Sequence, residues 1–218
     1  MCTSPPSTTC ELMNFNDLNN TTPNNLNVPN TTLLDTIHVE RGIIPANLCD
    51  YIVQDVEKRK WKPHTWYSAQ NDTYGSEETM ELDVQPATQE LQDLLTPIII
   101  QAGAAYNAKY TYPSERTSQI MNKFTGVRFN RYKPGQIMRY HLDHIHSIFD
   151  GKEKGIPVLS FILNFKDTYE GAKLFFWDDY AIDFGVGDIC MWPSPFLWPH
   201  GVTEAISGTR YSAVTWGW

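Results

Sequence analysis

Two segments in the first half of the chain place apolar residues on one stripe at helical spacing. The first opens at Pro45 and runs to about residue 60, and the second spans residues 86–108 and contains Pro97, which threatens a kink. Apolar side chains that recur every three or four residues lie on one face of a helix, so both segments are predicted to be amphipathic helices. The stripe residues are Leu48, Ile52, Val53 and Val56, then Leu91, Leu94, Leu95, Ile98 and Ile99.

After residue 120 the pattern changes to short apolar or alternating segments separated by turn sequences such as Lys-Pro-Gly, Asp-Gly and Ser-Gly. A further alternating segment, 36–40, precedes the first helix. Several β-segments at close spacing are typical of a sandwich or barrel. We therefore expect a mainly β (α+β) fold with helices flanking the β core. The predicted strands of this region are 127–132, 136–142, 158–165, 173–177, 188–192 and 209–216.

Two segments are too polar to contribute to that core. The first 35 residues are rich in Asn, Thr, Ser and Pro, and they bury too little surface to offset the backbone entropy of ordering, about 1–2 kcal/mol per residue. The chain is therefore divided into a low-complexity tail, 1–35, and one folded domain, 36–218. Within the domain, residues 62–81 are predicted to be a long loop, of the kind that often serves as a lid.

Composition narrows the class of protein. Hydrophobic residues make up 41% of the 218, which excludes a fully disordered chain, a coiled coil and a collagen. The formal net charge is −8 and no basic patch is evident, so nucleic acid is not an expected partner. The four cysteines are scattered and are interpreted as reduced thiols.

No apolar run approaches the roughly 18 residues needed to span a bilayer, so no membrane partner is expected. No Lys or Arg precedes Arg41, so the N-terminus has neither the charged region of a signal peptide nor an arginine-rich transit peptide. We therefore expect a soluble, cytoplasmic protein. Its oligomeric state is not indicated by the sequence.

The first candidate for chemistry is the tripeptide His141-Leu-Asp143. On a strand, residues two apart project to the same face, so this imidazole and carboxylate can converge on one point. His200, which follows a strand in the same β region, is the candidate for a third metal ligand. Two histidines and one carboxylate leave open positions on a metal ion, as in non-haem iron sites. His-x-Asp alone is weak, because an ordinary hydrogen-bonding pair gives the same sequence.

The second candidate is the last strand. Alternation puts Arg210, Ser212, Val214 and Trp216 on one face. If that face is the interior, Arg210 is a buried charge with no acidic neighbour in the sequence, and a buried charge must be paired. A ligand carboxylate, held by the Arg210 fork and the Ser212 hydroxyl, would be a fitting partner. Trp216 has the parity to line the same pocket.

Together these residues resemble the Fe(II)- and 2-oxoglutarate-dependent dioxygenases, and within them the prolyl 4-hydroxylase-like branch with its bacterial and phage members. The resemblance covers about residues 35–218 and implies a double-stranded β-helix (jelly-roll) core. The segments that carry it are Asn130-Arg-Tyr-Lys-Pro-Gly135, His141-Leu-Asp143, Leu163-Asn164, Glu170-Gly171, Gly187-Asp188, Trp192-Pro-Ser-Pro-Phe196, Pro199-His200 and Gly208-Thr-Arg-Tyr-Ser212.

The resemblance also implies roles for single residues. His141, Asp143 and His200 would ligate Fe(II), and Arg210, helped by Ser212, would bind the distal carboxylate of 2-oxoglutarate. Tyr132 matches the tyrosine that lines the cosubstrate pocket in the family. The cofactors implied are Fe(II), 2-oxoglutarate and dioxygen, with ascorbate as a further candidate. The implied reaction hydroxylates a C–H bond, first of all in a peptidyl proline, and releases succinate and carbon dioxide.

Three departures from the family pattern leave the substrate open. They are Gly171-Ala172 in place of Gly-Gly, Arg210 in place of the lysine of collagen-type enzymes, and Ile162 in place of a tyrosine. One alternative is a sibling oxygenase that acts on a free amino acid, another small molecule or a nucleobase. Another is a non-catalytic jelly-roll module that binds a metal or ligand. A zinc hydrolase is disfavoured because no His-Glu-x-x-His helix is present.

Overall fold

Two antiparallel β-sheets face each other in the computed structural model of the chain, which describes residues 32–68, 73–75, 81–110, 121, 123–143 and 157–218. The described residues from Thr32 to Trp218 form one compact unit, whereas the predicted tail lies outside them up to residue 31. The larger sheet has seven strands, in the order β1 (His38–Glu40), β12 (Ile189–Pro193), β8 (Leu159–Asn164), β15 (Arg210–Gly217), β6 (Arg128–Tyr132), β5 (Asp83–Pro86) and β2 (Lys62–Pro63).

The smaller sheet has four strands, and two further pairs of strands complete the β structure. The four-stranded order is β11 (Tyr180–Ala181), β10 (Leu174–Phe176), β13 (His200–Val202) and β7 (Met138–His141). The pairs are β14 (Ala205–Gly208) with β9 (Tyr169–Gly171), and β3 (Trp66–Ser68) with β4 (Thr73–Gly75).

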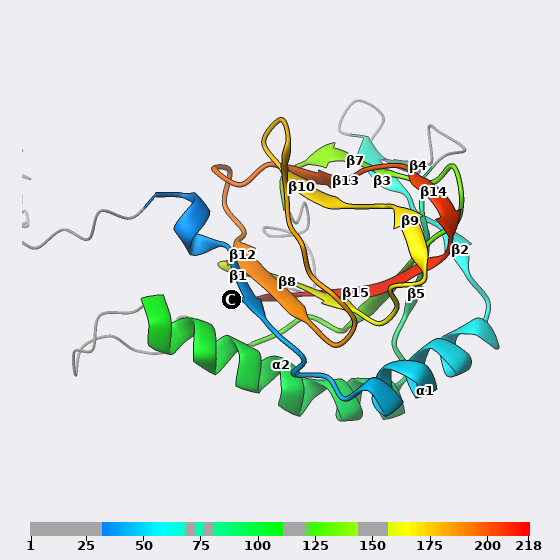
Figure 1. The fold of residues 1–218 in the computed structure, drawn as a ribbon, viewed down its shortest axis with the longest axis horizontal. Coiled ribbons are helices and arrows are strands. Elements are labelled where there is room, and N and C mark those ends of the chain that lie inside the picture. The colour runs from blue at the N-terminus through cyan, green and yellow to red at the C-terminus, as the bar shows by residue number, and fades with distance from the viewer. Residues whose placement is uncertain (1–31, 69–72, 76–80, 111–120, 122, 144–156) are drawn as a thin grey trace, which may run out of the picture. The chain divides into compact units, whose positions relative to one another are not determined.

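Both predicted helices are present, as α1 (Ala46–Glu57) and α2 (Gln89–Tyr110), and α2 continues through Pro97. Figure 1 shows them on one side of the larger sheet, with β7, β10 and β13 on the opposite side. A 3-10 turn, Leu34–Thr36, precedes β1. No described helix is both long and apolar enough to cross a membrane. The prediction of a mainly β fold with flanking helices is therefore confirmed.

The larger sheet has two different faces, because successive residues of a strand point to opposite sides. Its outer face packs on the helices, through side chains such as Phe129 and Ala213 of the sheet and Ile52 and Leu95 of the helices. Its inner face meets the smaller sheet in a second apolar cluster. That cluster includes Tyr132, Ile162, Leu174, Phe176, Trp192, Val202 and Val214.

Several short strands differ from the sequence prediction. The predicted loop 62–81 contains β2, β3 and β4, and residues 69–72 and 76–80 within it lie outside the described residues. Strands β5, β9, β11, β13 and β14 were not expected, and His200 begins β13 instead of following a strand. These strands are two to four residues long, too short for the alternation that signals a strand, and they are recognised by their pairing with other strands.

Candidate functional site

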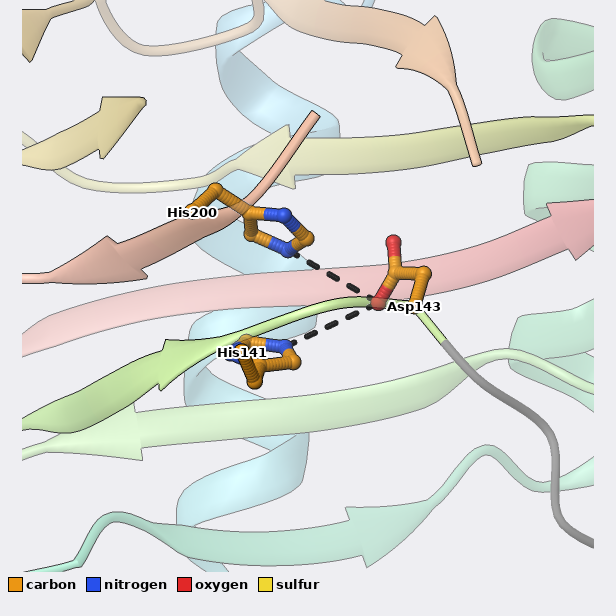
Figure 2. A group of neighbouring side chains, drawn as sticks. All are labelled: His141, Asp143 and His200. Atoms are coloured by element: carbon orange, nitrogen blue, oxygen red, sulfur yellow. Dashed lines mark ion pairs between the residues drawn. The ribbon is translucent and has the colours of Figure 1, made fainter. Parts of the chain in front are cut away.

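Three predicted metal ligands meet between the two sheets. His141 ends β7 and lies directly across from His200, the first residue of β13, while Asp143 follows β7 by two residues. One oxygen of Asp143, Oδ1, is 3.7 Å from Nε2 of His141 and 3.7 Å from Nε2 of His200. Figure 2 shows both rings directed at this oxygen. One ligand atom from each residue lies within 4.8 Å of the others, so the three could hold a metal ion.

The backbone fixes how the two imidazoles point. Nδ1 of His141 lies 2.8 Å from the carbonyl oxygen of Arg139, and Nδ1 of His200 lies 3.0 Å from that of Trp198. A carbonyl only accepts, so each Nδ1 carries the proton and donates it. With the proton on Nδ1, each ring directs its other nitrogen, Nε2, toward Asp143, and Nε2 is the atom that can bind a metal.

The carboxylate of Asp143 is also oriented. The hydroxyl of Ser160 donates to its second oxygen, Oδ2, and Ser160 lies 2.8 Å from the hydroxyl of Ser194. Both serines are buried, so the pair holds the carboxylate from the protein side while Oδ1 faces the imidazoles. Outer contacts of this kind commonly fix the orientation of metal ligands.

Burial and neighbouring groups set the charge states of His200 and Asp143. Burial lowers the pKa of His200 to about 4, so this imidazole is neutral at physiological pH. Burial alone would raise the pKa of Asp143, but the neighbouring His200 and His141 and the Ser160 hydroxyl outweigh it and hold that pKa well below its usual range. The site therefore presents an ionised carboxylate and a neutral His200, which is the form that metal binding requires.

Arg210 and Ser212 lie where the alternation of β15 predicts, on the inner face of the larger sheet. The Arg210 side chain is fully buried at 0% exposure, and its Nη1 donates to the carbonyl oxygen of Ala172 at 2.8 Å. Its Nε and Nη2 make no hydrogen bond to a described residue, and no described carboxylate lies within 4.0 Å. The buried hydroxyl of Ser212 likewise has no partner in the part of the chain that the structure describes. These three unsatisfied groups match the oxygens of a bound carboxylate.

Tyr132 is opposite Arg210 in the register of β6 and β15. The guanidinium carbon of Arg210 is 5.4 Å from the Tyr132 ring centre and 5.3 Å from that of Phe184, within the range of a cation–π contact. The structure thus brings Tyr132, Arg210 and Ser212 together, as the sequence predicts. Burial raises the pKa of Tyr132 to about 12, so the phenol keeps its proton.

The departure at Gly171-Ala172 has a structural counterpart. Gly171 has a φ of +76°, and a Cβ there would lie 2.2 Å from the carbonyl oxygen of Glu204, so only glycine fits. Ala172 also has a positive φ, +46°, which is uncommon outside glycine. Because the Ala172 carbonyl accepts from Arg210, this strained residue lies directly against the guanidinium.

A pocket opens next to the three metal-ligand candidates. Trp216 lines this pocket, as strand parity predicts, together with Tyr132 and Trp192. The sequence reasoning missed Arg128, which also lines this pocket. The signal was present: Arg128 has the same parity as Tyr132 on β6, two residues before Asn130 and four before Tyr132.

Comparison with known proteins supports the predicted relationship. Residues 127–218 match the model of the family described as the 2OG-Fe(II) oxygenase superfamily. This segment holds all seven site residues predicted from the sequence: Tyr132, His141, Asp143, His200, Arg210, Ser212 and Trp216. No curated protein matches the chain by sequence.

Solved structures of low sequence identity share the fold. A prolyl-4-hydroxylase from Pseudomonas putida is 19% identical, with a TM-score of 0.58 over 84% of this chain and 91% of that one. A viral collagen prolyl hydroxylase from Paramecium bursaria Chlorella virus-1, in its 2OG complex, is 17% identical, with a TM-score of 0.55 over 83% and 94%. A prolyl hydroxylase from Trichoplax adhaerens, in complex with a hypoxia inducible factor peptide fragment, is 12% identical, with a TM-score of 0.61 over 84% and 83%. These matches confirm the predicted double-stranded β-helix core.

Proposed function

Because residues 127–218 match the model of the 2OG-Fe(II) oxygenase superfamily, we propose that the chain is a hydroxylase of this superfamily whose iron is held by His141, Asp143 and His200. Enzymes of this superfamily need Fe(II), 2-oxoglutarate and dioxygen. The observation that carries the proposal is the convergence of two imidazole Nε2 atoms on one carboxylate oxygen, each at 3.7 Å.

The donor set suits Fe(II). Two imidazoles and one carboxylate match the ligand preference of non-haem iron and leave other coordination positions open. The rings of Trp192 and Phe176 surround His200, with centroids 4.8 and 5.6 Å from its own. These aromatic walls exclude water and keep the dielectric low around the ligands.

The unsatisfied groups on β15 suit 2-oxoglutarate. Nε and Nη2 of Arg210 would bind one carboxylate of this cosubstrate, and the Ser212 hydroxyl would donate to the same group. The Tyr132 ring would hold the Arg210 guanidinium in place through their cation–π contact. Trp216, farther along the same face, would line the pocket beside the cosubstrate.

When bound, iron and 2-oxoglutarate supply the oxidising chemistry: dioxygen gives one oxygen atom to succinate, formed with loss of carbon dioxide, and one to a substrate C–H bond. The chain's own residues bind, orient and desolvate the reactants. We favour peptidyl proline as the substrate, because the three solved structures that share the fold are prolyl hydroxylases and one of them holds a peptide.

The test is succinate release by the Fe(II)-loaded protein, screened over proline-rich peptides, free amino acids and nucleosides. We expect a proline-containing peptide to raise succinate release above the rate without substrate, with one hydroxyl gained per succinate. Asp143→Ala should abolish turnover, well beyond the roughly 10–100-fold loss typical of residues that only orient a ligand. Circular dichroism should report an unchanged fold.

Asp93→Ala is the matched control, since it removes an exposed carboxylate on α2 and should leave turnover unchanged. Two results would contradict the proposal. One is a metal-loaded protein that consumes no 2-oxoglutarate with any substrate of the screen, and the other is undiminished turnover in Asp143→Ala.

A further inference from the structure

The described arginines fall into two groups by their partners. Four of the six form ion pairs with carboxylates at 2.5–3.3 Å: Arg41 with Asp188, Arg59 with Asp55, Arg131 with Asp83, and Arg139 with Glu81. The other two, Arg128 and Arg210, have no described carboxylate within 4.0 Å. Both are on the inner face of the larger sheet. Because Arg210 is assigned to the cosubstrate, Arg128 is left as a cation that needs a different anion.

We propose that Arg128 binds a carboxylate of the molecule that is hydroxylated, so that the substrate carries a negative charge next to its reacting C–H bond. This inference rests on the proposed function and names the substrate class of the same site. It does not depend on whether the substrate is a peptide or a free amino acid, since either can supply a carboxylate.

Arg128 lies in the same pocket as the three metal-ligand candidates. It begins β6, is partly buried, and lines the pocket together with His141, Asp143 and His200. A group bound by Arg128 therefore shares a pocket with the reacting centre. Among the described residues that line this pocket, Arg128 is the one that carries a fixed positive charge.

Two contacts, with Asn130 and with Trp216, hold the Arg128 guanidinium. Its Nε donates to Oδ1 of Asn130 at 3.2 Å, and its carbon lies 5.5 Å from the Trp216 ring centre. The terminal nitrogens Nη1 and Nη2 make no hydrogen bond to any described residue and are not sealed off from the pocket. The guanidinium is held by its Nε and by the Trp216 ring, while Nη1 and Nη2 remain available. This arrangement can bind a carboxylate through two parallel hydrogen bonds.

The Arg128 charge is partly desolvated and has no ion-pair partner among the described residues. Burial lowers the pKa of the guanidinium, and Tyr132 and the negative charge of Asp143 only partly offset this effect. Asp143 is also committed to the metal in the loaded enzyme. A buried charge without a counter-ion is costly, and a substrate carboxylate removes that cost when it binds.

Arg128 lies apart from the proposed cosubstrate site. Arg128 pairs in register with Val214, and Arg210 lies four residues earlier on the same strand, about 13 Å away at the rise of a β-strand. Arg210 is enclosed and has Ser212 beside it, whereas Arg128 is in the open pocket. The two cations therefore serve two different anions. A single guanidinium also matches the single charge of a carboxylate better than the double charge of a phosphate.

The experiment measures binding, without turnover, to protein loaded with Fe(II) and 2-oxoglutarate under nitrogen. Titration calorimetry compares probes that differ only by acid against amide. N-acetylproline with N-acetylprolinamide tests an α-carboxylate, and acetyl-Glu-Pro-amide with acetyl-Gln-Pro-amide tests an acidic side chain. We expect the acid to bind at least tenfold tighter than its amide in one of these pairs, which identifies the source of the carboxylate.

Arg128→Gln should abolish that preference, Arg128→Lys should retain part of it, and 2-oxoglutarate affinity should change less than threefold in both. Arg131→Gln is the control, because Arg131 is on the outer face of the same strand, paired with Asp83, and its loss should leave the preference intact. Equal or absent binding of acid and amide in both pairs, or a preference that survives in Arg128→Gln, would overturn the proposal. So would loss of 2-oxoglutarate binding in Arg128→Gln, which would assign Arg128 to the cosubstrate. Failure of the wild type to bind 2-oxoglutarate would instead refute the proposed function.

Discussion

The two faces of the seven-stranded sheet are built from the same strands and have different chemistry. On β15, Ala213 faces the helices and is fully buried among apolar side chains. Its neighbour Ser212 is on the inner face, equally buried, with a hydroxyl that has no partner among the described residues. Strand β6 repeats the contrast with Phe129 on the outer face and Asn130 on the inner face.

This difference shows where the chain gains stability and where it gives some up. The outer face buries apolar side chains between sheet and helices, which is the main source of folding free energy. The inner face buries polar groups that the protein itself does not satisfy, each of which costs about 1–3 kcal/mol until a ligand satisfies it. Substitutions on the outer face should therefore change stability, and substitutions on the inner face should change ligand binding.

The largest effect on the inner face is expected from Arg210→Ala. Without the guanidinium, 2-oxoglutarate loses its charged partner in a buried site, and binding should weaken by about 3–5 kcal/mol. Calorimetric titration of the anaerobic Fe(II) protein measures this. The thermal stability of the ligand-free variant should not fall by a comparable amount, because Arg210 pairs with no described carboxylate. Unchanged affinity for 2-oxoglutarate would refute the role of Arg210.

On the outer face, Leu95→Ala should show the opposite behaviour. Leu95 is fully buried at 0% exposure between α2 and the sheet, so truncation leaves a cavity and should lower the free energy of unfolding by about 2–5 kcal/mol. Urea denaturation measures the loss. In conditions where the variant is folded, its 2-oxoglutarate affinity should match that of the wild type. A large drop in affinity with little loss of stability would contradict the division between the faces.

Ser212→Ala sharpens the comparison within a single side chain. The variant loses one hydrogen bond to the cosubstrate carboxylate, so 2-oxoglutarate binding should weaken by about 1.5–3 kcal/mol. The ligand-free protein should be as stable as the wild type or more stable, because an unsatisfied buried hydroxyl is removed. Parallel calorimetry and denaturation test both halves. A less stable protein with normal affinity would mean that Ser212 serves packing.

At mildly acidic pH, within one unit of 6.5, the smallest effect is a pH dependence of stability that arises from His64. Burial, with Arg128 adding to it, lowers the pKa of His64 to about 3, whereas the unfolded chain has the ordinary value of 6.5. Between these values only the unfolded state takes up this proton, so stability is complete above about pH 6.5 and falls by up to about 1.4 kcal/mol per unit as pH drops toward 3.

The test is urea denaturation of the metal-free protein between pH 7 and 4, compared with His64→Asn. The variant should show a shallower loss of stability, by as much as one proton's contribution. His200 has a depressed pKa too and remains in both proteins, so some slope should persist in the variant. Identical slopes in the two proteins would show that His64 takes up its proton equally in the folded and unfolded states.

The sequence predicts the parts of the site that depend on local alternation. The spacing His141-Leu-Asp143 and the parity of Arg210, Ser212 and Trp216 are properties of single strands, and the structure has each of these residues on the inner side. The two helices follow from apolar stripes in the same way. What alternation cannot provide is pairing between strands. The opposition of His141 to His200 comes from the β7–β13 register, and β13 is too short to be recognised.

Arg128 shows the same limit. In Val127-Arg-Phe-Asn-Arg-Tyr132 two arginines have opposite parity, and Arg128 shares that of Tyr132, but the sequence does not say which arginine has a carboxylate partner. In the structure Arg131 forms an ion pair with Asp83 of β5, a strand that the sequence pattern did not reveal, and Arg128 has no carboxylate partner among the described residues. The polar segment 62–81 contains strands that pair with each other, β3 with β4, and with β5 outside the segment, β2. Its predicted role as a lid stays a prediction.

The central claim is that His141, Asp143 and His200 hold iron next to a 2-oxoglutarate bound by Arg210. The most direct measurement is the visible absorption spectrum of the protein with Fe(II) and 2-oxoglutarate under nitrogen. The wild type should show a weak charge-transfer band that requires both additions and is absent in Asp143→Ala. No band in wild-type protein shown to contain iron, or an undiminished band in Asp143→Ala, would contradict the assignment of the site.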